Sequence, residues 1–183
     1  MKILAFAASN SRKSINRTLL DHAIGRFKSE VDDRAEFEVL DLNDFEMPIY
    51  SVDREQESGI PAEARTFFEK IGSADAIMIS FAEHNGSVTA AWKNIFDWMS
   101  RIDMKLWQNK PMVILAASPG GRGGAGVLQS QIASAPFFAG DIRASHSVGS
   151  WYDAFDAETG RLTRAEDIQK LGDALATLAL EPA

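Results

Sequence analysis

The feature that most constrains this chain is a set of short runs that are apolar at almost every position. "ILAFA", "AIMIS" and "MVILAA" begin at Ile3, Ala76 and Met112, and none of them alternates apolar with polar residues. A strand of this kind is buried on both faces, as in a parallel sheet that is covered by helices. The segments between the runs are long enough to be crossover helices. The sequence therefore predicts an α/β fold with a parallel sheet as its middle layer.

Five strands are predicted in all, and the second has the weakest pattern. They cover residues 3–7, 37–40, 76–81, 112–117 and 142–148. Helical spacing of apolar residues predicts helices over residues 16–27, 61–71, 87–101, 126–133 and 164–180. Asn16 and Ser87 are expected to cap the first and third of these helices, and Pro61 to open the second. The segment 50–60 is the most loop-like part of the chain.

Length and charge exclude several classes of function. At 183 residues the chain predicts a single domain, residues 1–183. Its net charge of -7 argues against nucleic acid or a membrane surface as a partner, because both attract a basic face. The absence of cysteine excludes disulfides, zinc–thiolate sites and thiol nucleophiles. No amino-terminal apolar stretch approaches the roughly 20 residues of a membrane span, so a cytoplasmic location is expected.

The first predicted strand is followed by "SNSRKSIN", residues 9–16. Unpaired N–H groups at the start of a helix attract an anion, and small hydroxyl side chains add further donors. An anion site would use Ser9, Ser11, Ser14 and Asn16, with Arg12 or Lys13 as the counter-charge. The alternative is that these side chains only cap the helix, and spacing alone leaves the two interpretations about equal. The glycines and the GK[ST] ending of a P-loop are absent, which disfavours triphosphate hydrolysis.

The third predicted strand runs into "FAEHNGS", residues 81–87. Its Asn85–Gly86 pair predicts a tight turn with positive φ that brings backbone close to a flat ligand, although an ordinary strand-to-helix turn would use much the same residues. His84 is suited to acid–base chemistry, but a lone histidine on a loop is more often a polar surface group. The aromatic side chains that follow are expected in the core or at an interface: Trp92, Phe96 and Trp98.

The fourth predicted strand ends at "SPGGRGGAGVL", residues 118–128. Glycine at this density lets main-chain amides approach a ring without an intervening Cβ atom. The alternative is a flexible surface loop. Because the carboxyl ends of parallel strands share one edge of the sheet, we expect the three loops to converge on one ligand.

Taken together, over residues 1–148, these loops resemble those of the NADPH-dependent FMN reductase family. That family has a phosphate loop of the form GS-x-R-x-x-S-x-N, which Ser9, Ser14 and Asn16 match. The family arginine falls at Ser11, and Arg12 lies one place later, so either residue could meet the phosphate.

The second and third loops extend the resemblance. The family reads P-E-Y-N-G-S and then LKN-x-x-DW, against residues 82–87 and 92–98 here, with Ala82 in place of proline and His84 in place of tyrosine. The family pattern S-x-G-x-x-GG matches Ser118, Gly120, Gly123 and Gly124.

The resemblance implies a flavodoxin-like three-layer sandwich with a five-stranded parallel sheet in the order 2-1-3-4-5. It implies FMN as cofactor, with NADPH or NADH as hydride donor, a small quinone-like electron acceptor, and a homodimer or homotetramer. It implies no catalytic side chain and no metal, because the flavin carries the chemistry. The residues that it assigns to cofactor binding are Ser9, Ser11, Arg12, Ser14, Asn16, Ala82, Glu83, His84, Asn85, Gly86, Ser118, Gly120 and Gly121.

Two other functions remain open at this point. A flavodoxin-like electron carrier would suit the acidic composition, although the "NGS" and "KNIFDW" segments favour a reductase. A flavin-free domain could bind another phosphorylated ligand with the same loops. The choice between NADPH and NADH is also open, because Arg12, Arg17 and Arg122 could each meet a 2′-phosphate or be a surface charge.

Overall fold

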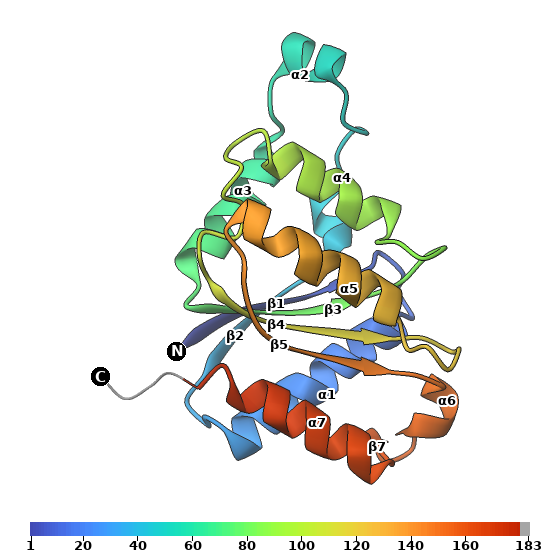
Figure 1. Cartoon of the computed structure of the whole chain (residues 1–183). Coiled ribbons are helices and arrows are strands. Elements are labelled where there is room, and N and C mark those ends of the chain that lie inside the picture. The colour runs from blue at the N-terminus through green and yellow to red at the C-terminus, as the bar shows by residue number, and fades with distance from the viewer. Residues whose placement is uncertain (180–183) are drawn as a thin grey trace.

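The computed structural model describes residues 1–179 and has a five-stranded parallel sheet between two layers of helices (Figure 1). The strands are β1 (Lys2–Ala8), β2 (Glu36–Leu40), β3 (Ala76–Phe81), β4 (Pro111–Ala117) and β5 (Asp141–Val148). Their order is β2-β1-β3-β4-β5, and every neighbouring pair is parallel. The predicted strands, their direction and the flavodoxin-like order are confirmed.

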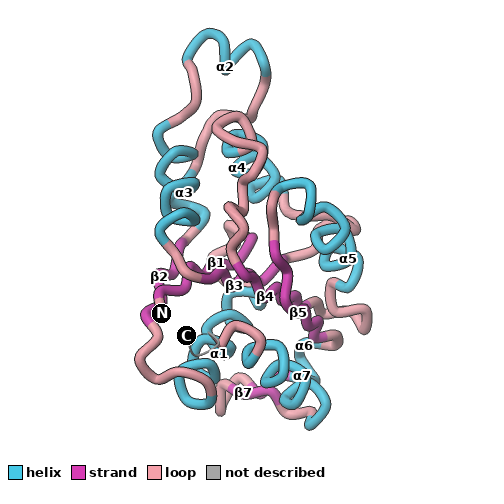
Figure 2. The backbone as a smooth tube through the Cα atoms, turned by 60° about the vertical axis from the view of Figure 1, so that its left-hand side comes forward, coloured by secondary structure: helices cyan, strands magenta, loops and turns pink. Residues whose placement is uncertain are grey.

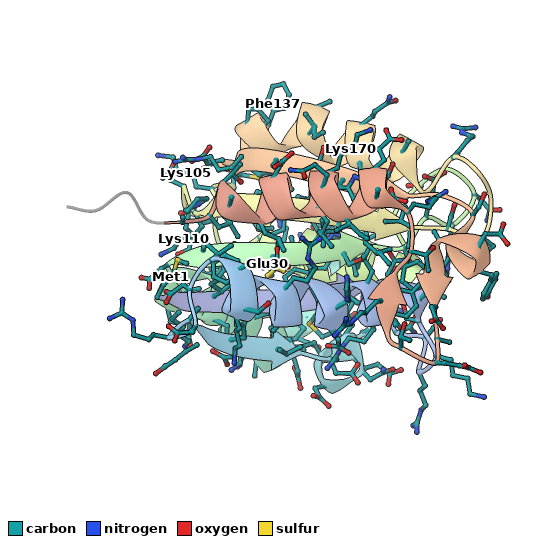
Figure 3. All side chains as sticks on the ribbon, turned by 90° about the horizontal axis from the view of Figure 1, so that it is seen from below. Met1, Glu30, Lys105, Lys110, Phe137 and Lys170 are labelled. Atoms are coloured by element: carbon teal, nitrogen blue, oxygen red, sulfur yellow. The ribbon has the colours of Figure 1, made fainter. Side chains whose placement is uncertain are left out.

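The helices cover both faces of the sheet, as Figure 2 shows with the strands seen nearly end-on. On one face lie α3 (Ala62–Ser73), α4 (Ala90–Met99) and α5 (Ala125–Ser134), and on the other lie α1 (Ile15–Glu30) and α7 (Ala165–Ala176). In Figure 3 α1 and α7 run side by side, with Glu30 between them. Arg26 joins the two helices, because it donates to the Ile168 carbonyl oxygen of α7, while Glu30 of its own helix also accepts from it.

Two predicted caps are wrong. Ser14, rather than Asn16, caps α1, since its Oγ accepts the N–H of Arg17 at 3.3 Å. Thr89, rather than Ser87, caps α4 by accepting the N–H of Trp92 at 3.2 Å. Both segments offer several side chains that can cap, and the one nearest the first helical turn is used. The predicted end of the last helix, Leu180, lies outside the described residues.

The segment expected to be a loop contains a short helix, α2 (Val52–Ser58), which projects from the body of the molecule (Figure 1). Ser51 caps it, and Gly59 ends it at a φ of 73°. The remaining elements are too short to leave a periodic pattern in the sequence. They are the 3₁₀ helices η1 (Leu42–Phe45) and η2 (Ala135–Phe138), the helix α6 (Trp151–Ala154), and a hairpin of β6 (Phe155–Asp156) and β7 (Arg161–Leu162).

The core consists of one apolar cluster on each face of the sheet. Alternate residues of β1 pack into the two clusters. Leu4 and Phe6 belong to the cluster with α3 and α4, while Ile3 belongs to the cluster with α1. This explains why the central strands are apolar throughout. Trp92 and Trp98 are each 1% exposed and belong to the first cluster, so they are core residues and not part of an interface.

The two edges of the sheet differ. Met1, Lys105 and Lys110 lie together at the amino-terminal edge (Figure 3). The loops singled out in the sequence lie at the opposite, carboxyl edge. Among the helices of residues 1–179, none combines the length and the apolar character needed to cross a membrane.

Candidate functional site

The register of the sheet brings the three loops together. Ala8 at the end of β1 pairs with Phe81 at the end of β3, and Phe81 pairs with Ala116 near the end of β4. The three loops therefore start side by side. They start where the strand order reverses, since β1 has β2 on one side and β3 on the other. Open parallel sheets bind ligands at this position.

The loop after β1 folds on itself before α1 begins. The Ser9 hydroxyl accepts the N–H of Ser11 at 3.2 Å, and the Ser11 carbonyl oxygen accepts the N–H of Ser14 at 3.2 Å. Ser9 and Ser14 are buried, whereas Ser11 and Arg12 are exposed. The first N–H groups of α1 thus point out of the helix into a turn that hydroxyl side chains line.

A hollow of about 80 Å³ lies against this turn. Its lining includes Ser9, Ser11, Arg12 and Arg17. Arg12 forms no ion pair with any described residue, so its charge is available to a ligand. The acidic member of the lining is Asp41, whose Oδ1 accepts the N–H of Asn43 at 2.9 Å. Hydroxyl groups, the Arg12 guanidinium and a helix start make this hollow suited to a phosphate, whereas Arg17 already pairs with Asp21 at 2.9 Å.

Asn16 is turned away from the hollow, into the protein. It is 2% exposed; its Nδ2 donates to the Ala117 carbonyl oxygen at 3.0 Å, and its Oδ1 accepts the Ala117 N–H at 2.8 Å and the Ser80 hydroxyl at 2.9 Å. The side chain therefore fixes the start of α1 to the ends of β3 and β4. Its predicted contact with the cofactor stays a prediction.

The loop after β3 makes the predicted tight turn. Asn85 and Gly86 have φ values of 53° and 78°, and His84 and Ser87 exchange backbone hydrogen bonds of 2.9 and 3.1 Å. Ala82 is buried at the root of the turn. The His84 side chain is exposed beside the tip and makes no hydrogen bond to another described residue. It is free to meet a ligand that lies over the turn.

The loop after β4 is anchored on both sides. Ser118 donates its N–H to Val148 at 3.2 Å, and the Gly120 carbonyl oxygen accepts the N–H of Ser150 at 2.9 Å. A Cβ atom on Gly120 would have no other atom within 4 Å, so its backbone faces open space. This open space leaves room for a ligand, and the hydrogen bonds hold the loop in one shape. The predicted approach of its main-chain amides to the cofactor stays a prediction.

Thr89 and Asn94 shape the site through contacts that the sequence pattern does not reveal, although Asn94 belongs to the matched family segment 92–98. The Thr89 hydroxyl donates to the Ala8 carbonyl oxygen at 3.0 Å, which ties α4 to the end of β1. Asn94 donates to the Met47 carbonyl oxygen at 3.1 Å and accepts the N–H of Tyr50 at 2.9 Å. These partners lie far apart along the chain, so only the folded structure reveals them.

A larger hollow, of about 660 Å³, lies elsewhere. It is bounded by α1, α7 and the β6–β7 hairpin, and His22, Arg26 and Gly160 are among its lining residues. Since it is away from the carboxyl ends of the strands, we do not place the cofactor there. Within residues 1–179, no group of three or more His, Asp or Glu side chains is arranged to hold a metal ion.

Comparison with known proteins gives a consistent result. A family model described as NADPH-dependent FMN reductase matches residues 1–150. A quinone reductase of Escherichia coli strain K12 is 39% identical over 80 residues, which cover 44% of this chain and 43% of that protein. A 2-hydroxy-1,4-benzoquinone reductase of a Burkholderia species is 33% identical over 133 residues, covering 72% of this chain and 68% of that protein.

A solved structure has the same architecture at low sequence identity. It is FerB, a flavoenzyme NAD(P)H:(acceptor) oxidoreductase from Paracoccus denitrificans. Its TM-score is 0.68 at 22% identity, and the match covers 95% of this chain and 92% of that one. At this sequence identity the similarity supports the fold alone. The match to the E. coli protein spans less than half of that protein's length.

Proposed function

The chain belongs to the NADPH-dependent FMN reductase family, and on that premise we propose that it is an FMN-containing oxidoreductase. Its electrons come from NADPH or NADH, and its acceptor is a small quinone-like molecule. The observation that carries the proposal is the phosphate-sized hollow at the start of α1, beside two loops whose backbone is exposed. We also propose that residues 1–183 form one domain. A cytoplasmic location fits, because reduced nicotinamide nucleotides are available there.

Each loop has its own part in binding. The phosphate of FMN would be held by Ser9, Ser11, Arg12 and Ser14 together with the first N–H groups of α1. The flavin ring would lie against residues 82–86 and 118–121. When bound, FMN supplies the redox chemistry, by taking up hydride and passing electrons to an acceptor.

The chain itself orients the reactants. Among the described residues at the carboxyl edge, no side chain is arranged as a nucleophile with an adjacent base, so we assign no catalytic residue. Exposed backbone at Gly120 and the exposed His84 side chain leave one side of the site open. A site open in this way admits small planar acceptors, and the E. coli relative is a quinone reductase.

An anaerobic titration tests this function. The purified protein is reconstituted with FMN, and its visible absorbance is followed while NADPH and, separately, NADH are added. We expect the flavin band to bleach within the mixing time of a manual experiment and to return when a benzoquinone is added. A bound flavin that neither nucleotide reduces would indicate an electron carrier, and a protein that binds no flavin would contradict the proposal.

We further propose that the protein forms a homodimer or a homotetramer through the projecting arm around α2. Ile49 and Val52 on this arm are 75% and 58% exposed, and no residue of α2 is buried. Apolar side chains at this exposure favour a partner surface. Trp92, Trp98 and Trp151 are buried and therefore unavailable for such a contact.

Sedimentation velocity tests the assembly. We expect the wild-type protein to sediment as a dimer or tetramer, and the double variant Ile49→Ser, Val52→Ser to shift toward the monomer while keeping its fold. A wild-type protein that is monomeric with FMN bound would contradict this proposal.

A further inference from the structure

Glu83 joins two loops of the site. It follows β3 directly, yet its Oε2 accepts the backbone N–H of Val127, in the first turn of α5, at 3.0 Å. The helix has no side-chain cap of its own, because its N-cap is Gly124 at a φ of 80°, and its first turn contains no acidic residue. Glu83 therefore supplies both the missing acceptor and the negative charge that a helix start favours.

The glycines of the third loop make this contact sterically possible. A Cβ atom on Gly126 would lie 3.3 Å from both carboxylate oxygens of Glu83, closer than most such contacts. A Cβ atom on Gly124 would lie 2.9 Å from the Cβ of Ala116. The glycine spacing thus lets α5 begin directly against the carboxylate.

We propose that Glu83 is a positioning residue that clamps the loop after β3 to the loop after β4, and so holds the two loops in the shape that binds the flavin ring. This inference rests on the proposed function for its ligand, but the clamp itself is a property of the apo-protein. It differs from a direct contact between the Glu83 carboxylate and FMN. A clamp needs a hydrogen-bond acceptor at this position, whereas a direct electrostatic contact needs the charge.

Two substitutions separate these roles. Glu83→Gln keeps an oxygen that can accept the Val127 N–H but removes the charge, whereas Glu83→Ala removes both. We expect the dissociation constant for FMN to rise about tenfold or more in Glu83→Ala, and by less than about threefold in Glu83→Gln. Glu69→Ala is the matched control, because Glu69 is an exposed residue of α3 away from the site.

Hydrogen exchange of the apo-protein gives a second measurement that does not depend on FMN. We expect the amide of Val127 and its neighbours to exchange faster in Glu83→Ala than in the wild type, Glu83→Gln or Glu69→Ala. If Glu83→Ala does not fold, Gly126→Ala takes its place, because its new methyl group would force the Glu83 carboxylate to shift by a few tenths of an ångström. We expect this shift to weaken FMN binding, while alanine remains a good helix former.

The outcomes are distinguishable. Unchanged exchange and unchanged FMN affinity in Glu83→Ala would overturn the clamp. The clamp would also be overturned if Glu83→Gln lost as much FMN affinity as Glu83→Ala while its amides exchanged at the wild-type rate. That result would favour a direct contact between the Glu83 charge and FMN. A wild-type protein that binds no FMN would contradict the proposed function and the flavin part of this inference, while the exchange comparison would still decide whether the clamp exists.

Discussion

At the scale of single residues, the arrangement of the site depends on buried polar side chains that reach across the chain. Asn16 is the clearest case, because its amide bonds to Ala117 and to Ser80 from the start of α1. It also explains why one polar residue, Ser80, can stand at the end of an otherwise apolar strand with 0% exposure.

We predict that Asn16→Ala lowers the free energy of unfolding by about 2 to 4 kcal/mol, since it leaves buried backbone and hydroxyl groups without partners. Urea unfolding of the apo-protein measures the change. Asn10→Ala is the control, because Asn10 is exposed, and we expect it to change the free energy of unfolding by less than about 0.5 kcal/mol. Equal free energies of unfolding for the two variants would show that the hydrogen bonds of Asn16 to Ala117 and Ser80 do not stabilise the fold.

At this scale the sequence indicates candidate residues but not their partners. Ser9 and Ser11 were predicted for the phosphate loop, and both line the hollow. Asn16 and Glu83 were predicted as cofactor contacts, yet both hydrogen-bond to protein groups far along the chain. Those partners depend on the register of the strands, which a local sequence pattern does not contain.

At the scale of elements, the loops at the carboxyl edge support one another through close backbone contacts. A Cβ atom on Gly149, directly after β5, would lie 2.3 Å from the carbonyl oxygen of Gly121. Any side chain at Gly149 would therefore push apart the loops that follow β4 and β5.

We predict that Gly149→Ala lowers the free energy of unfolding by about 1 to 3 kcal/mol through this clash. Gly25→Ala is a matched comparison, because Gly25 is exposed within α1 and a Cβ atom there would meet nothing within 4 Å. It should raise the free energy of unfolding by about 0.5 to 1 kcal/mol. Thermal or urea unfolding measures both, and a Gly149→Ala protein as stable as the wild type would contradict the close approach.

The packing of α7 on β5 predicts a dependence of stability on pH. His146 is 7% exposed, and its Nε2 lies 3.1 Å from Asp167 Oδ1, while Arg164 bonds to Asp167 and to the Gly149 carbonyl oxygen. Burial lowers the pKa of His146 from its ordinary value of 6.5; Lys170 and Arg164 act in the same direction, and Asp167 acts against them. Glu166 lines the same surface hollow as His146 and Asp167.

Because the unfolded chain binds a proton at His146 more readily than the folded protein does, stability should fall as the pH drops through 6.5. Urea midpoints measured from about pH 8 to about pH 5.5 follow the change. We expect His146→Gln to flatten part of this dependence and His84→Gln, at an exposed site, to leave it as it is. If the stability of His146→Gln depended on pH as the wild type's does, His146 would not be the source of the dependence.

The elements differ in how well the sequence predicts them. The central strands and the long helices have strong patterns and were predicted closely. The helix α2 was taken for a loop because no residue of it is buried, so it has no apolar face to detect. The predicted caps of α1 and α4 each lie two residues from the observed ones, because several neighbouring side chains can act as caps.

At the scale of the whole molecule, the continuous apolar strands already imply a parallel sheet covered on both faces. They do not fix the order of the strands, because any right-handed crossover satisfies the same local patterns. The order was predicted from the family resemblance and is confirmed by the pairing of β1 with both β2 and β3. That pairing creates the point of reversal at which the three loops meet.

The central claim is that the carboxyl edge holds FMN by its phosphate. The most direct test compares the dissociation constants of FMN and riboflavin for the apo-protein, measured by flavin fluorescence, since the two ligands differ only in the phosphate. We predict that FMN binds at least about tenfold more tightly, because hydroxyl groups, Arg12 and the start of α1 act on the phosphate alone. Equal affinities, or tighter binding of riboflavin, would contradict the claim.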